Sequence, residues 1–235
     1  MWLRLFMNIL ALDTCTESCS AALISANQIY TRIADAPREH SQRLLPMVDE
    51  VLQDAEITIA DVQLIAYGRG PGSFTGIRIC TSMTQGLALG QDIPVIGIST
   101  LATMAQMAIN THEATDIFCS IDARMNEVYW AQYKNVAGIA TLIGEEHVSS
   151  PDDVSLQFNQ GANIIACGTG FDAYPQLLTL VNKITLSNTV KYPDASAMIA
   201  LAQAGFNDNQ HTNVDELAPV YLRDTVTWKK LPGRE

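Results

Sequence analysis

The stretch GRGPGSFTGIR, residues 68–78, decides how the rest of the chain is interpreted. A phosphate-binding loop needs inward-pointing backbone N–H groups and gains from a helix N-terminus directly behind it, so a glycine-rich loop before a helix suits that role. It is not a Walker A loop, because Ile77-Arg78 stands where Lys-Ser/Thr would be. It is not a dinucleotide fingerprint either, because the third glycine would fall on Ser73 or Thr75. Two interpretations stay open: a phosphate cradle, or a tight turn with Ser73 or Thr75 as the helix N-cap.

Apolar patterns around this loop predict three strands and then alternating helices and strands. The predicted strands are residues 8–14, 18–25, 28–34, 62–68 and 93–99, and the predicted helices are residues 37–55, 75–91 and 100–109. Pro46 should kink the first of these helices or lie near its start. This half of the chain therefore has the order βββαβαβα.

The second half of the chain repeats this order. The predicted strands are residues 116–122, 127–134, 138–144 and 163–170, and the predicted helices are residues 151–158, 171–180 and 194–206, the last with Asp194 as N-cap. Asp13 and Asp122 end the first strand of each half, and a glycine pair follows the fourth strand of each.

The repeat predicts an α/β fold of two βββαβα lobes around a cleft, which the two aspartates and the glycine loops would line. We assign residues 1–110 to the N-terminal lobe. Residues 111–235 would form a C-terminal lobe of the same basic topology, smaller or degenerate, followed by a tail.

The composition limits the function classes. Fourteen Lys and Arg against 25 Asp and Glu give a net charge of −11, the wrong balance for a protein that neutralises phosphates itself, so tRNA or other nucleic acid would be reached only through a partner. The tail TWKKLPGRE is the best basic patch, and its simpler interpretation is a solvated terminus. No segment reaches the about 20 apolar residues of a membrane helix. Five cysteines without a C-x-x-C pair indicate reduced thiols in a cytoplasmic protein.

Candidate catalytic residues are few. Asp13 and Thr14, with Thr16, could orient a Mg²⁺-bound water and a phosphate, alongside Gly72 and Ser73 of the glycine loop. The simpler interpretation, which we favour, is an aspartate that hydrogen-bonds the turn into the next strand. The four histidines form no H-x-x-x-H or H-E-x-x-H pair, so we predict no metal site. His40 is expected to be a polar residue at a helix start.

The helix after the glycine loop lacks charge between Arg78 and Asp92. We expect one stripe of it to pack on the sheet: Ile79, Met83, Gly86, Leu87 and Gly90. The opposite face would then carry small uncharged residues: Thr81, Ser82, Thr84, Gln85 and Ala88. Depletion of charge is typical of an interface core, so this face predicts a partner. The alternative is that this chain's own elements cover it.

Several of these segments resemble one known family. ILALDTCTESCSAAL, PREHSQRLLPMV, LIAYGRGPGSFTGIRI, IDARMNEVYWAQY and PVYLRDTVTWKK together are similar to the bacterial TsaB (YeaZ) family, over nearly the whole chain. Met7 aligns with the usual start of that family, so residues 1–6 would be an additional leader. The resemblance implies a duplicated actin-like fold (ribonuclease H-like, ASKHA), in agreement with the repeat.

The resemblance also implies a function. The family takes part in making N6-threonylcarbamoyladenosine next to the anticodon of tRNAs that read codons beginning with A. The TsaD paralogue transfers the threonylcarbamoyl group from threonylcarbamoyl-AMP, TsaB pairs with it, and the TsaE ATPase joins them. TsaB proteins also form homodimers. A non-enzymatic scaffold subunit without a required cofactor, with at most weak ATP or ADP binding, is therefore expected.

The family's contact with TsaD uses helices of the N-terminal lobe. Combined with the uncharged helix face, this predicts an interface formed by six residues: Arg43, Met47, Thr81, Thr84, Gln85 and Ala88. The competing hypothesis is a small ATP-dependent phosphotransferase or ATPase of the same superfold. In that case Asp13, Thr14, Gly72 and Ser73 would bind Mg²⁺ and phosphates, and Asp122 would act as base or orient a water.

Overall fold

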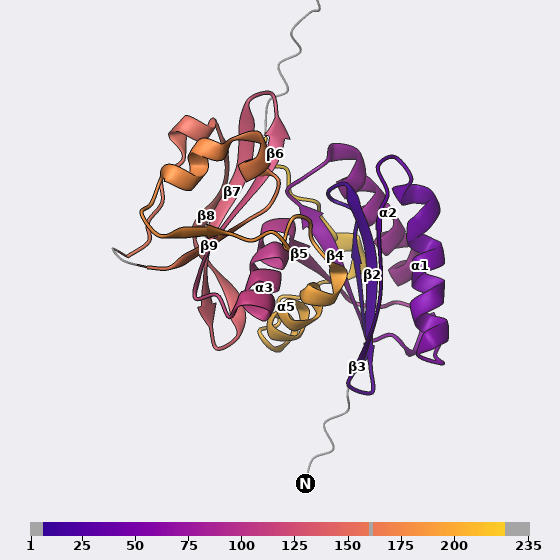
Figure 1. Ribbon diagram of the computed structural model, residues 1–235. Helices are drawn as coiled ribbons and strands as arrows, with labels where there is room; N and C mark the ends of the chain where they lie inside the picture. The colour runs from indigo at the N-terminus through magenta and orange to yellow at the C-terminus, as the bar shows by residue number, and fades with distance from the viewer. Residues whose placement is uncertain (1–6, 160–161, 224–235) are drawn as a thin grey trace, which may run out of the picture.

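The computed structural model describes residues 7–159 and 162–223. It contains two five-stranded sheets, and the helices α3 and α5 lie between them (Figure 1). The predicted leader at residues 1–6 and the whole tail TWKKLPGRE lie outside the described residues. Sheet one has the strand order β3-β2-β1-β4-β5, and sheet two has the order β8-β7-β6-β9-β10. The first three strands of each sheet are antiparallel and the last three parallel. This is the predicted duplicated, actin-like topology.

The elements follow one another in the predicted order. The strands of sheet one are β1 (Ile9–Asp13), β2 (Ser18–Ser25), β3 (Gln28–Asp35), β4 (Leu64–Gly70) and β5 (Val95–Ser99). Those of sheet two are β6 (Asp116–Arg124), β7 (Glu127–Val136), β8 (Ile139–Ser149), β9 (Ile164–Cys167) and β10 (Ile184–Leu186). The helices are α1 (His40–Asp54), α2 (Phe74–Leu89), α3 (Thr100–His112), α4 (Gly170–Ala173) and α5 (Ala195–Asn207).

Two predicted helices differ in the structure, and one short strand was not predicted. The helix expected at residues 171–180 is divided into α4 and a 3₁₀ turn, Pro175–Thr179, because proline has no N–H to continue the helix and restricts the residue before it. The helix expected at residues 151–158 is only the 3₁₀ turn Pro151–Asp153. The short strand β10 was not predicted, since three residues are too few for a recognisable pattern.

The two central helices each pack mainly on the sheet of the other half of the chain (Figure 1). Helix α3, which follows β5 of sheet one, contacts β6 to β9, whereas α5, which follows β10 of sheet two, contacts β1, β2 and β5. A single apolar core joins both sheets to these helices, and it contains Leu101, Met104 and Met198. The predicted boundary at 110/111 falls in the last turn of α3, and it stays a prediction.

The outer face of sheet one is covered by α1 and α2, which form a second core with it. In α1, Leu44, Val48 and Val51 recur at helical spacing on the buried side, and Pro46 lies inside the helix. Within the described residues no helix is long and apolar enough to cross a membrane. All five cysteines are free, as predicted, and all five are buried.

Candidate functional site

The glycine loop is fastened directly to the β1–β2 turn. The Ser73 backbone N–H donates to the Cys15 carbonyl oxygen at 2.7 Å, and the Thr14 hydroxyl donates to the Gly76 carbonyl oxygen at 2.7 Å. Ser73, not Thr75, caps α2: its side-chain oxygen accepts from the Gly76 N–H at 3.4 Å. The structure thus brings the predicted residues together, and the Thr14 and Ser73 polar groups bond to Gly76 and Cys15 across the contact.

Glycine is required in this loop for close packing. A Cβ atom at Gly72 would lie 2.0 Å from the Cys15 carbonyl oxygen, and one at Gly76 would lie 2.0 Å from the Thr14 carbonyl oxygen. Real Cβ atoms do not approach so closely, so a larger residue here would separate the loop from the turn. These contacts favour the tight-turn interpretation, because the backbone of the loop packs directly on the backbone of the β1–β2 turn.

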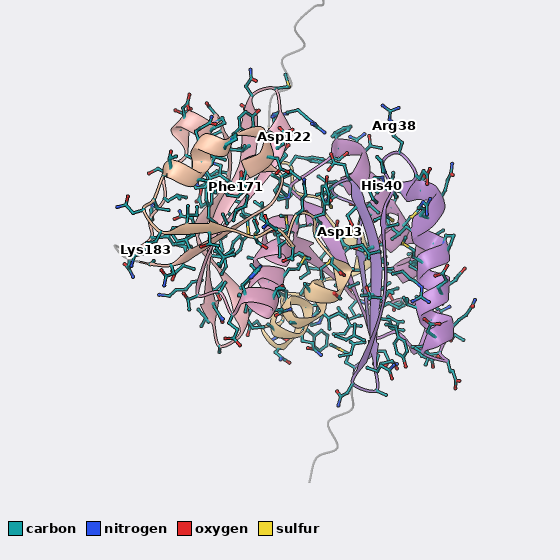
Figure 2. All side chains as sticks on the ribbon, in the orientation of Figure 1. Asp13, Arg38, His40, Asp122, Phe171 and Lys183 are labelled. Atoms are coloured by element: carbon teal, nitrogen blue, oxygen red, sulfur yellow. The ribbon has the colours of Figure 1, made fainter. Side chains whose placement is uncertain are left out.

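Asp13 lies within the molecule at the end of β1 (Figure 2). Its Oδ1 accepts from the Cys15 N–H at 2.9 Å, the turn contact that the sequence favoured. Burial raises the pKa of Asp13 from 3.8 to about 7, against the lowering effect of the Cys15 hydrogen bonds. Its Oδ2 has no hydrogen-bond partner, and a Cβ atom at Gly68 would lie only 2.1 Å from it. The carboxyl group is enclosed by protein and does not fit a hydrated Mg²⁺ ion.

Asp122 holds the equivalent turn in sheet two (Figure 2). Its Oδ1 accepts from the Arg124 N–H at 2.9 Å, again two residues onward, and its Oδ2 lies 2.9 Å from the Arg124 guanidinium. Of the residues predicted to line the cleft, Gly72 lines a cavity of about 400 Å³ together with Tyr129 of sheet two. A cavity of about 570 Å³ between the sheets is lined by Arg69, Glu146 and residues of β5, β8 and α5, and neither aspartate is among its lining residues.

Metal ligands do not gather elsewhere in the described ranges 7–159 and 162–223: no three His, Cys, Asp or Glu side chains there are close enough to hold an ion. His40 is buried at the start of α1, with Nε2 2.9 Å from the Thr16 carbonyl oxygen, so it is the polar helix-start residue that we expected. The expectation that no metal binds stays a prediction.

The predicted face of α2 is wrong by roughly a third of a turn. Thr84 and Ala88 are fully buried against sheet one, whereas Gly86 and Gly90, expected to pack, are exposed. Met47 of α1 is also buried, and its sulfur lies 3.9 Å from Cys19 Sγ. The remaining predicted interface residues are accessible to different degrees: Arg43 and Gln85 are exposed, and Thr81 is half-buried.

A signal for the correct face was present in the sequence. The residues that face the sheet are small and recur every four positions: Gly76, Cys80, Thr84 and Ala88. Small residues let a helix approach its neighbours closely, so this stripe marks the packing side. The opposite face of α2, which points away from the sheet, was not identified from the sequence, because apolar residues occur on both sides of the helix.

The exposed side of α2 carries large apolar residues. Phe74 and Leu89, the first and last residues of the helix, are 57% and 64% exposed, and Leu45 of α1 is 41% exposed. A hollow of about 400 Å³ on this side is lined by six residues: Phe74, Thr75, Arg78, Ile79, Ser82 and Met83. We call the exposed residues Leu45, Phe74, Ser82 and Leu89, with half-buried Ile79 and Met83, the α1–α2 face. Such an apolar surface is characteristic of a protein-interaction site.

The chain is similar to proteins of known family along almost its whole length. The family model described as "TsaD: tRNA N6-adenosine threonylcarbamoyltransferase" matches residues 24–231. The "tRNA threonylcarbamoyladenosine biosynthesis protein TsaB" of Escherichia coli (strain K12) is 43% identical, over 97% of this chain and 100% of that protein. The protein of the same name from Haemophilus influenzae is 42% identical, over 97% and 99%. The structure of YeaZ from Pseudomonas aeruginosa superposes with a TM-score of 0.87 at 36% identity, covering 92% of this chain and all of that one.

Proposed function

The chain belongs to the TsaB family, within the wider TsaD family, and on that premise we propose that it acts in the biosynthesis of threonylcarbamoyladenosine in tRNA. We propose further that it is a non-catalytic subunit, which pairs with the TsaD paralogue and, with the TsaE ATPase, supports transfer of threonylcarbamoyl from threonylcarbamoyl-AMP to adenosine N6. With a net charge of −11, it would reach tRNA only through the complex, in the cytoplasm.

The observation that carries the pairing is the exposed apolar α1–α2 face. On α1, Glu50 and Asp54 form ion pairs with Arg32 of β3, so this side of the helix faces β3. Leu45 lies about 140° around the helix from Glu50 and is therefore on the side toward α2. On α2, Phe74 and Leu89 extend the same surface. Because the TsaD family model covers both helices of this chain, TsaD should present equivalent helices, so two similar faces can pack together.

The same face would serve for self-association in the absence of TsaD. A face that pairs with a paralogue of the same fold can also pair with a second copy of itself, in an isologous interface. Homodimer and heterodimer would then exclude each other, and TsaD would compete with self-association. Size-exclusion chromatography of the chain alone and with TsaD measures this competition.

The site at Asp13 supports a non-catalytic role over the ATPase alternative. The Ser73 N–H, which would face a phosphate, donates to Cys15, and Gly68 closes over the Asp13 carboxyl group. The direct test is ATP turnover by the purified chain with Mg²⁺. Robust turnover that the Asp13→Asn substitution abolishes would show that the chain is an enzyme and that the scaffold proposal is wrong.

The pairing is tested by a charge on the α1–α2 face. Ser82→Glu introduces a carboxylate at an exposed position, so the fold should be unaffected, whereas the carboxylate would be buried without a partner in the complex. We expect TsaD affinity to fall by about 3 kcal/mol, or about 100-fold, measured by calorimetry. Modification of tRNA in a reconstituted reaction, followed by nucleoside mass spectrometry, should fall in parallel.

The matched control is Ser155→Glu, the same exchange at an exposed position of the second half of the chain. It should leave both affinity and modification unchanged. If Ser82→Glu binds TsaD as the wild type does, the α1–α2 face is not the interface. If both variants lose binding equally, the effect is one of net charge and not of this face.

A further inference from the structure

A short segment near the end of the described chain connects both lobes to α2. Residues 218–223, which we call the strap, first contact sheet one. The Tyr67 hydroxyl donates to the Ala218 carbonyl oxygen at 3.2 Å, and the Val220 N–H donates to the Arg69 carbonyl oxygen at 2.7 Å. Arg69 lies in β4 directly before the glycine loop, so the strap is anchored where that loop begins.

The middle of the strap contacts the first turn of α2. The Tyr221 and Phe74 rings have centroids 5.6 Å apart, and the Arg78 Nε–H donates to the Tyr221 hydroxyl oxygen at 3.4 Å. The Arg78 guanidinium carbon lies 3.8 Å from the centroid of the Phe74 ring, a cation–π contact. Phe74 and Arg78 border the hollow of the α1–α2 face, so one side of this face is held by the strap.

The far end of the strap is attached to sheet two. Arg223 donates through Nε to Glu127 Oε2 at 3.0 Å and through a terminal nitrogen to the Ala123 carbonyl oxygen at 3.0 Å. Its side chain is only 18% exposed, and it also lies over the Tyr129 ring. By comparison, Arg124, which pairs with Glu17 of sheet one, has a side chain 74% exposed, and pairs so open to solvent contribute little.

Between its two ends the strap spans a cavity. About 400 Å³ lies between the strap and α2, lined by the apolar side chains of Ile77, Tyr129, Val220 and Leu222 among others. The strap is therefore held by its end contacts more than by packing beneath it. A displacement of sheet two relative to sheet one would act through Arg223 on Tyr221, and from there on Phe74.

We propose that the strap transmits the relative position of the two lobes to the first turn of α2, with Arg223 as the positioning residue, and so regulates docking at the α1–α2 face. The identity of the docked partner rests on the proposed function. The mechanical link from Arg223 to Phe74 does not, because it is a property of the isolated chain. The two parts can therefore fail separately.

The first experiment is hydrogen exchange on the isolated chain. Arg223→Ala should speed exchange of the backbone amides of residues 77–81 at the start of α2 by about tenfold, while those of α5 keep their rates. Arg124→Ala, the matched removal of the exposed interlobe arginine, should change neither. Unchanged exchange at the start of α2 in Arg223→Ala overturns the inference, whatever TsaD does. Equal acceleration in α5 also overturns it, since that indicates general destabilisation.

The second experiment measures affinity for TsaD. Arg223→Ala should weaken binding by about tenfold, within the range usual for coupling between sites. The double variant Arg223→Glu, Glu127→Arg swaps the two charges and should restore both TsaD binding and protection from hydrogen exchange. Each single variant should lose both. Faster exchange with unaltered TsaD affinity overturns the regulatory part. A wild-type chain that does not bind TsaD contradicts the proposed function instead, and the exchange result then stands alone for the strap.

Discussion

The two sheets have the same strand order but different covers on their outer faces. Sheet one is covered by α1 and α2, of 15 and 16 residues, whereas the matching positions over sheet two hold a three-residue turn, the four-residue α4 and another turn. Sheet two compensates with aromatic packing: the Phe118 ring meets Phe171 and Trp130 edge-to-face at 5.1 and 6.4 Å. A lobe can thus lose its outer helices if large side chains fill the layer.

The two lobes share the elements of the common core but differ in the surface that their outer helices expose. Both lobes keep the central helices and the aspartate turn, which the shared core needs. Only the N-terminal lobe keeps long outer helices, and only there, within the described residues, do large apolar residues remain exposed along a helix pair. The long helices both bury the second core of sheet one and present the α1–α2 face.

The largest effect is expected at the loop contact of sheet one. Gly72→Ala places a Cβ atom 2.0 Å from the Cys15 carbonyl oxygen and should cost about 5 kcal/mol of unfolding free energy in urea. In sheet two, Gly170→Ala meets the Ser120 hydroxyl at 2.1 Å and Ser120 Cβ at 2.8 Å. The hydroxyl can rotate away, whereas the contact with Cβ remains, so the loss should be smaller than for Gly72→Ala, where the clash is with the backbone. Gly86→Ala, with open space around it, should stabilise by about 1 kcal/mol at most.

The order of these three variants is the test. If Gly170→Ala costs as much as Gly72→Ala, the two loops are equally constrained and the comparison between the lobes fails at this point. If Gly72→Ala behaves like Gly86→Ala, the loop is not held against the β1–β2 turn.

The next effect concerns the buried Asp13. Its pKa is raised from 3.8 to about 7, so the folded state binds a proton more tightly than the unfolded state does. The stability gained from this proton is fully present below about pH 4 and is lost as the pH rises through about 7. The loss amounts to about 4 kcal/mol at most. Asp13→Asn should remove it.

Unfolding in urea at pH 4 and pH 8 gives the comparison. The asparagine side chain of the Asp13→Asn variant retains an oxygen for the Cys15 N–H, so wild type and variant should be alike at pH 4 and the variant more stable at pH 8. A variant that loses stability at pH 8 would mean that the ionised carboxylate contributes to folding. That result would support the alternative hypothesis that Asp13 binds a cation or another ligand.

The smallest effect concerns α5, which belongs to the second half of the chain but packs on sheet one. Asp194 caps this helix as predicted, accepting from the Ser196 N–H at 2.8 Å, and its charge also raises the pKa of Asp13. Asp194→Ala should cost about 1 kcal/mol at low pH, where Asp13 is protonated. It should also move the pH-dependent loss of stability to lower pH.

Asp208→Ala at the other end of α5 is the matched control and should change stability by about 0.5 kcal/mol or less. If Asp194→Ala leaves the pH dependence in place, the two aspartates are not coupled, and α5 does not connect the second half of the chain to the Asp13 site electrostatically.

Much of the fold could be predicted from the sequence. Apolar runs that end in Asp13 and Asp122, each followed by two more strands and a glycine loop, were sufficient to predict the duplication and most of the elements along each lobe. These signals are local: strand periodicity, turn residues and the Asp194 cap act within a few residues. The 171–180 helix failed because Pro175 interrupts an otherwise suitable pattern.

Contacts between distant segments decided the rest. Whether GRGPGSFTGIR is a cradle or a turn depends on Cys15, far earlier in the chain, whose carbonyl oxygen takes the Ser73 N–H. The side of α2 that faces the sheet could not be determined by hydrophobicity, because both sides carry apolar residues. The spacing of the small residues was its only local signal, and packing places Thr84 and Ala88 inside. No sequence signal predicted that α3 would pack mainly on sheet two and α5 mainly on sheet one. Local chemistry selects each element, and the burial of its faces is settled only when all the layers are assembled.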